Sequence, residues 1–96
     1  MMILVTYDIG TTSKSGAHRL KNVAKICQDY GVRVQNSVFE CIVDATQYTV
    51  LKHELLKEID SAQDSLRFYR LGEKYSTKVE HFGIKFALKV EEPLVI

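Results

Sequence analysis

The stretch MILVTYD, residues Met2–Asp8, decides the fold, because it is an apolar, β-prone run that ends on a single carboxylate. The residues that follow, GTTSKS at positions 10–15, predict a loop. We therefore expect a central strand that delivers Asp8 to the start of a polar loop, where sheet proteins commonly place reacting groups. The more ordinary role for Asp8 is an Asx-turn or a cap for the following helix.

The segment between Gly10 and Gln28 contains no acidic residue, although the whole chain has a net charge of only +1. Its apolar residues recur at helical spacing and predict a helix over about Gly16–Tyr30. The basic residues of this segment are Lys14, His18, Arg19, Lys21 and Lys25. All but Arg19 share one stripe of that helix. A solvated lysine face is the ordinary explanation, whereas a stripe of one sign beside a strand-end carboxylate favours a polyanion bound close to a metal ion.

The length of 96 residues predicts a single domain over 1–96. A chain this small often completes its core by association, so we expect a homodimer. Cys27 and Cys41 lack the spacing of a metal motif or a disulfide framework, and they indicate buried thiols in a reducing cytosol. The sequence has no basic signal-peptide region and no apolar run of about 20 residues. We therefore expect a cytoplasmic protein without membrane contact.

The middle of the chain predicts two further strands. Gly31 follows the first helix, where a left-handed helix terminator belongs. Val32–Gln35 and Ser37–Val43 then form either a hairpin that turns at Asn36 or one continuous bent strand.

The rest of the chain predicts a second helix and two more strands. Asp44 and Gln47 have the spacing of a capping box, which opens that helix. Leu66–Leu71 and Lys78–Phe82 are the predicted strands, and the tail from about residue 83 is expected to contact the partner protomer or another protein. The predicted fold is α+β: a ferredoxin-like β-α-β-β-α-β sandwich with two helices on one sheet face and an additional C-terminal strand.

Several segments together resemble one family: the strand at 4–8, the basic helix with Arg19, and the run YGVRVQNSVFEC at Tyr30–Cys41. The resemblance continues in Tyr69–Gly72, Val79–Gly83 and Pro93–Ile96. It is to the small CRISPR-associated metal-dependent nuclease that partners the integrase in spacer acquisition. The resemblance implies an antiviral-defence protein that hydrolyses phosphodiester bonds of RNA, DNA or both.

The resemblance also implies a homodimer in which Asp8 faces its symmetry mate and the two carboxylates share one Mg²⁺, with Mn²⁺ as an alternative ion. Because Mg²⁺ keeps several waters and takes only one or two carboxylates, one acid per chain can suffice. By this resemblance Asp8 is the catalytic residue and the metal ligand.

Supporting or nucleic-acid-binding roles are predicted for a larger set of residues. By resemblance these are Tyr7, Arg19, Arg33 and Phe39, and the basic stripe adds Lys14, Lys21 and Lys25. Tyr7 and Phe39 have core packing as their ordinary alternative. For Arg33 the alternative is a surface ion pair, for example with Glu40.

Two functions therefore remain open. One is a metal-dependent endonuclease. The other is a non-catalytic, DNA-binding scaffold of the spacer-integration complex, in which basic helices bind phosphates and the C-terminal strand at Pro93–Ile96 docks the integrase subunit. A generic ferredoxin-like ligand-binding domain is allowed by the fold alone, but the run of family motifs argues against it.

Overall fold

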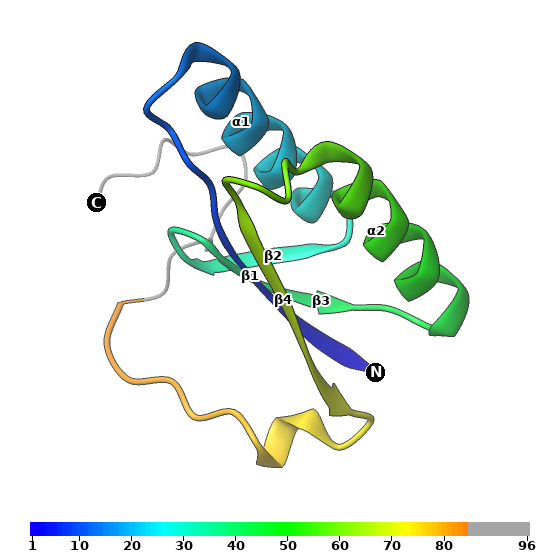
Figure 1. Cartoon of the computed structure of the whole chain (residues 1–96). Coiled ribbons are helices and arrows are strands. Elements are labelled where there is room, and N and C mark those ends of the chain that lie inside the picture. The colour runs from blue at the N-terminus through cyan, green and yellow to red at the C-terminus, as the bar shows by residue number, and fades with distance from the viewer. Residues whose placement is uncertain (85–96) are drawn as a thin grey trace.

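A four-stranded antiparallel sheet with two helices on one face forms the molecule, as the computed structural model of the chain shows for residues 1–84 (Figure 1). The elements are β1 (Met2–Asp8), α1 (Lys14–Gln28), β2 (Gly31–Gln35), β3 (Val38–Ile42), α2 (Ala45–Glu58), β4 (Ser65–Gly72) and a short 3₁₀ helix, η1 (Tyr75–Thr77). The strands lie in the order β2-β3-β1-β4, so β1 has a neighbour on each side. The predicted ferredoxin-like β-α-β-β-α-β order is confirmed.

The alternation of β1 separates a core face from an open face. Ile3, Val5 and Tyr7 are buried against the helices, whereas Leu4, Thr6 and Asp8 alternate with them and point to the other side of the sheet. The buried core comprises Ile3, Val5, Tyr7, Ile9, Val23, Cys27, Phe39, Cys41, Val43, Tyr48, Leu51 and Leu55. Both cysteines are free and buried, as predicted, and burial raises the pKa of Cys27 to about 12.

Local caps explain where the helices begin. Ser13, and not Asp8, caps α1, because its hydroxyl accepts a hydrogen bond from the Gly16 N–H at 3.1 Å. The predicted capping box of α2 is confirmed by the reciprocal bonds between Asp44 and Gln47, at 2.7 and 2.9 Å. Asp8 therefore does not cap α1, which was the more ordinary role considered for it.

Residues 31–42 form a hairpin rather than one bent strand, with the turn at Asn36 and Ser37. The prediction that Gly31 is a left-handed terminator was wrong, since Gly31 is the first residue of β2 and its φ is not positive. A Cβ at Gly31 would lie 2.1 Å from the Glu40 carbonyl oxygen. The glycine is therefore required by the close approach of β3, and not by the end of the helix.

The predicted strand Lys78–Phe82 was also wrong for the part of the chain that the structure describes. Gly72 has φ +79°, and there the chain leaves the edge of the sheet, passes through η1 and continues without pairing to a strand. A β-prone run becomes a strand only where an edge supplies ladder partners, and this segment has none within residues 1–84. The rest of the expected tail, including Pro93–Ile96, lies outside the described residues. No helix of the described part is long and apolar enough to span a membrane.

Candidate metal site and nucleic-acid groove

Asp8 lies at the end of the central strand, exposed on the sheet face that the helices leave open. It pairs with Ser65 of β4, while the ladder to β3 on the other side ends at the pair Thr6–Val38. A rigid strand thus fixes the backbone of Asp8, and its carboxylate is open to solvent. This is the placement that the sequence predicted.

In the part of the chain that the structure describes, Asp8 does not belong to a ready-made metal site. Within residues 1–84 no group of three or more His, Cys, Asp or Glu side chains could hold a metal ion. An exposed carboxylate is nevertheless the ligand type that Mg²⁺ prefers, and Mg²⁺ needs only one or two of them. The chemistry of Asp8 therefore fits a divalent ion, provided that the other ligands come from outside the protomer.

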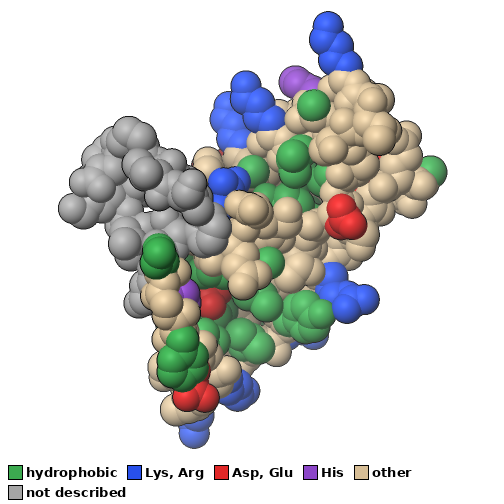
Figure 2. All heavy atoms as spheres, turned by 90° about the vertical axis from the view of Figure 1, so that its left-hand side faces the viewer, with side chains coloured by type: hydrophobic (Ala, Val, Ile, Leu, Met, Phe, Trp, Pro, Cys, Tyr) green, Lys and Arg blue, Asp and Glu red, His purple; other side chains and the backbone are tan. Residues whose placement is uncertain are grey.

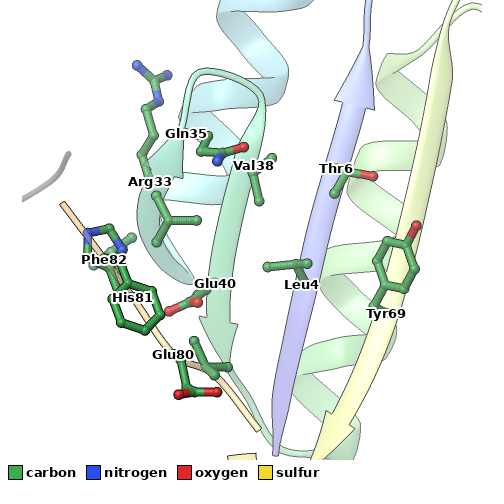
Figure 3. Close-up of a pocket in the computed structure, with 13 residues that line it drawn as sticks. Leu4, Thr6, Arg33, Gln35, Val38, Glu40, Tyr69, Glu80, His81 and Phe82 are labelled. Carbon is green, nitrogen blue, oxygen red and sulfur yellow. The ribbon is translucent and has the colours of Figure 1, made fainter. Parts of the chain in front are cut away.

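The open sheet face is grooved, and apolar side chains line the groove together with polar and charged ones. Figure 3 shows Leu4 and Thr6 of β1, Val38 and Glu40 of β3 and Tyr69 of β4 along the groove, with Glu80, His81 and Phe82 beside it. Figure 2 shows hydrophobic side chains gathered over this side of the molecule. Exposed large apolar residues include Val32, Tyr69 and Phe82, which line the groove, and Ile42 of β3. An exposed apolar patch of this kind marks an interaction surface.

The basic stripe of α1 is exposed, as predicted for Lys14, His18, Lys21 and Lys25. Lys21 and Lys25 line a second groove, which lies between α1 and the β2–β3 turn. Arg33 and Tyr7 line the same groove, together with Asn36 and Ser37 of the turn. The structure thus brings part of the stripe next to Arg33, a combination that the spacing of the sequence does not reveal.

Tyr7 and Phe39 lie on the core face, behind the sheet as seen from Asp8. Their side chains are 6% and 0% exposed, and their rings stack with centroids 6.3 Å apart. The Arg33 guanidinium lies over the Phe39 ring, 5.2 Å from its centroid, and its Nε is buried without a hydrogen-bond partner among residues 1–84. Arg33 therefore does not form the ion pair with Glu40 that was its ordinary alternative. Burial raises the pKa of the Tyr7 hydroxyl.

Arg19 differs from the other predicted site residues because it is held by an ion pair. Its Nε and its second guanidinium nitrogen donate to Asp64 at 2.8 and 3.1 Å. Arg19 and the backbone N–H groups of Asp60 and Gly10 hold the pKa of the Asp64 carboxyl down at about 2. Sequence reasoning missed Asp64, whose only signal was its place in a polar turn before a strand.

Comparisons with known proteins identify the chain's relatives. The family described as "CRISPR associated protein Cas2" matches residues 1–79. The "CRISPR-associated endonuclease Cas2" of Halalkalibacterium halodurans is 60% identical over 95 residues, which are 99% of this chain and 99% of that protein. The "CRISPR-associated endoribonuclease Cas2" of Nitratidesulfovibrio vulgaris is 51% identical and covers 100% of this chain and 94% of its own length. A crystal structure of Streptococcus pyogenes Cas2 at pH 6.5 superimposes with a TM-score of 0.76 at 52% identity, over 86% of this chain and 100% of that one.

Proposed function

Because the chain belongs to the family of CRISPR-associated Cas2 proteins, we propose that it is an endonuclease of the adaptation module that uses Asp8 to hold a divalent ion. The observation that carries this proposal is the exposed carboxylate of Asp8 at the end of the central strand. Its relatives are named both endonuclease and endoribonuclease. RNA and DNA are therefore both proposed as substrates.

The proposed ion is Mg²⁺, with Mn²⁺ as the alternative, and it would be held by Asp8 from each of two protomers. When bound, such an ion neutralises charge on the phosphate that is attacked and promotes loss of a proton from the attacking water. The protein contributes the position of Asp8 on a strand that is paired to Ser65. On the same sheet face the neighbours of Asp8 are the polar residues Thr6, Ser65 and Arg67, and a second copy seated on this face would shield the site from bulk water.

A test of the function separates the enzyme from the scaffold. Purified protein is incubated with single-stranded RNA and with duplex DNA, in Mg²⁺, in Mn²⁺ and in chelator. Cleavage of either substrate that requires the metal supports the nuclease. Binding of duplex DNA without cleavage in any metal would contradict the nuclease and support the scaffold, which is the second candidate because Lys21, Lys25 and Arg33 share one groove.

We propose the homodimer on the same face, because a single Asp8 gives an incomplete site within residues 1–84 and exposed apolar side chains, Val32, Ile42 and Tyr69, lie toward the other end of this face. The similarity to Cas2 structures is compatible with such a dimer. The CRISPR integrase subunit is proposed as a further partner on the strength of the family alone.

We expect the dimer to be broken by charge on the open sheet face. Val32 is 50% exposed and lines the groove on that face, so Val32→Glu should shift the protein from dimer to monomer in light scattering at micromolar concentration. Val50, which is 45% exposed on α2, provides the matched control, and Val50→Glu should leave the dimer unchanged. A wild-type protein that is monomeric at this concentration, or equal effects of the two variants, would contradict the proposed interface.

We expect the groove beside α1 to bind nucleic-acid phosphates. Replacing Lys21 and Lys25 by Ala should weaken duplex binding for any sequence and should reduce the slope of log affinity against log salt by about 0.9 for each phosphate that the protein no longer neutralises. Lys57→Ala, at an exposed lysine in the last turn of α2, is the control and should change neither quantity. Titrations at several salt concentrations measure both. If the double variant retains the affinity and slope of the wild type, the lysines form only a solvated face.

A further inference from the structure

Asp64 is a buried carboxylate that belongs neither to the proposed metal site nor to the basic groove. Its side chain is 0% exposed, and both of its oxygens are used. Oδ1 accepts from the Gly10 N–H at 3.0 Å and from Arg19 at 3.1 Å, while Oδ2 accepts from the Asp60 N–H at 2.8 Å and from Arg19 Nε at 2.8 Å. A buried carboxylate is costly unless it is paired and fully hydrogen-bonded, and this one is both.

The contact between Asp64 and Gly10 fixes the loop that follows Asp8. A Cβ on Gly16 of α1 would lie 1.8 Å from the Gly10 carbonyl oxygen, so the helix packs directly on the loop backbone. A Cβ on Gly10 itself would lie 3.3 Å from the Gln63 carbonyl oxygen. The loop is therefore held by α1 on one side and by the turn before β4 on the other.

The place of Asp64 in the chain extends this hold to Asp8. Ser65, the next residue, is the ladder partner of Asp8, while Asp64 itself binds Gly10, two residues after Asp8. On the opposite side the regular β1–β3 ladder has already ended at Thr6. The Tyr7 N–H still donates to the Ser37 carbonyl oxygen on that side at 3.1 Å, and from Asp8 onward the backbone takes its support from β4 and from the carboxylate of Asp64.

We propose that Asp64, oriented by Arg19, is a positioning residue that sets the direction of the Asp8 carboxylate for a divalent ion. This inference rests on the proposed function of Asp8. In this proposal Arg19 orients Asp64. Its guanidinium donates to both carboxylate oxygens and so holds them in the direction of the Gly10 and Asp60 N–H groups. It also links α1 to a turn that is 45 residues away in the chain.

The arrangement requires a carboxylate and not merely a polar side chain of the same shape. Asn offers one acceptor oxygen and one NH₂ group. In Asp64→Asn, one of the two backbone N–H groups, of Gly10 or of Asp60, would therefore face a donor. The variant keeps the volume of the side chain and loses the hydrogen bond from one of these two N–H groups.

The test uses the full chain and compares Asp64→Asn with wild type, with Asp8→Ala and with Asn22→Ala. Asn22 is the matched control, because it also ties α1 to a later segment, by a 2.8 Å bond to Glu58, but does not contact the loop. Amide hydrogen exchange over residues 8–12 reports on the loop, calorimetric titration with Mn²⁺ reports on Asp8, and thermal unfolding reports on overall stability.

We expect Asp64→Asn to exchange faster over residues 8–12 and to bind Mn²⁺ about ten-fold more weakly, the scale found when a group that supports a metal ligand is removed. Asn22→Ala should lower the unfolding temperature without changing either quantity. Should Asp64→Asn fail to fold, Arg19→Lys serves the same comparison, since a lysine keeps the charge but cannot make two parallel contacts.

One result would overturn the positioning role without contradicting the proposed function. In it, a folded Asp64→Asn variant binds Mn²⁺ as tightly as wild type, while Asp8→Ala binds it more weakly. A purely structural role for Asp64 would give this result, with a lower unfolding temperature as its only effect. If wild type and Asp8→Ala bind Mn²⁺ equally, the metal role of Asp8 and the inference built on it both fail.

Discussion

Asp8→Asn is expected to reduce metal-dependent cleavage by about 10²- to 10³-fold, the scale of losing a group that stabilises charge in the transition state. In the proposed dimer the substitution removes both protein ligands of the ion at once, because the two-fold axis duplicates the change. The fold should be retained, since Asp8 is exposed and its neighbours in β1 carry the core contacts. Single-turnover cleavage in Mg²⁺, together with thermal unfolding, measures the two effects separately.

Asp29→Asn is the matched control for this substitution. Asp29 is also an exposed carboxylate, at the C-terminal cap of α1, and the same change of charge there should leave cleavage within about two-fold of wild type. Undiminished cleavage by Asp8→Asn, after contaminating nuclease has been excluded, would refute the mechanism. An equal loss in Asp29→Asn would show that the effect is one of net charge.

Gly16→Ala is expected to have the second largest effect, on folding. Gly16 is buried in the first turn of α1, and the added methyl group would lie 1.8 Å from the Gly10 carbonyl oxygen and 2.9 Å from its carbonyl carbon. Backbone atoms cannot rotate away, so the helix or the loop after Asp8 must move. We expect a loss of about 3 kcal/mol in the free energy of unfolding, at the upper end of the usual cost of overpacking.

Urea denaturation measures this loss, with Ala17→Ser as the control. Ala17 is the next residue of α1 and is exposed, so one added atom there should cost no more than about 0.5 kcal/mol. Unchanged stability of Gly16→Ala would mean that the loop can move without cost. That result would also weaken the proposal that this loop holds Asp8 in place.

Local patterns of the sequence predicted the elements that carry the site. Successive side chains of a strand point to opposite faces of the sheet. Because Ile3 and Val5 of β1 face the core, Asp8 must lie on the other face. The capping box at Asp44 and the exposed lysines of α1 were predicted for the same reason, because residues three and four apart are neighbours within one helix. The family motifs then assigned a nuclease role that no periodicity could supply.

The wrong predictions concern residues whose role depends on distant backbone. Gly31 has the local appearance of a helix terminator, but β3 approaches it too closely for any side chain. Lys78–Phe82 has β-prone residues, yet the chain leaves the sheet at Gly72 and no described strand pairs with it. In both cases the prediction rested on local sequence, and the presence or absence of a neighbouring strand decided the outcome.

The sequence by itself determined the fold class, through the order of its elements, and it determined the exposure of Asp8 and the single-sign stripe of α1, because these two depend on residues within one element. Only the tertiary structure decided which charges are available for binding. Lys21 and Lys25 share a groove with Arg33 because α1 lies beside the β2–β3 turn, whereas Arg19, from the same helix, is held by Asp64. A contact between residues 45 positions apart leaves no periodic signal in the sequence, since it depends on how the turn before β4 packs against the loop after β1.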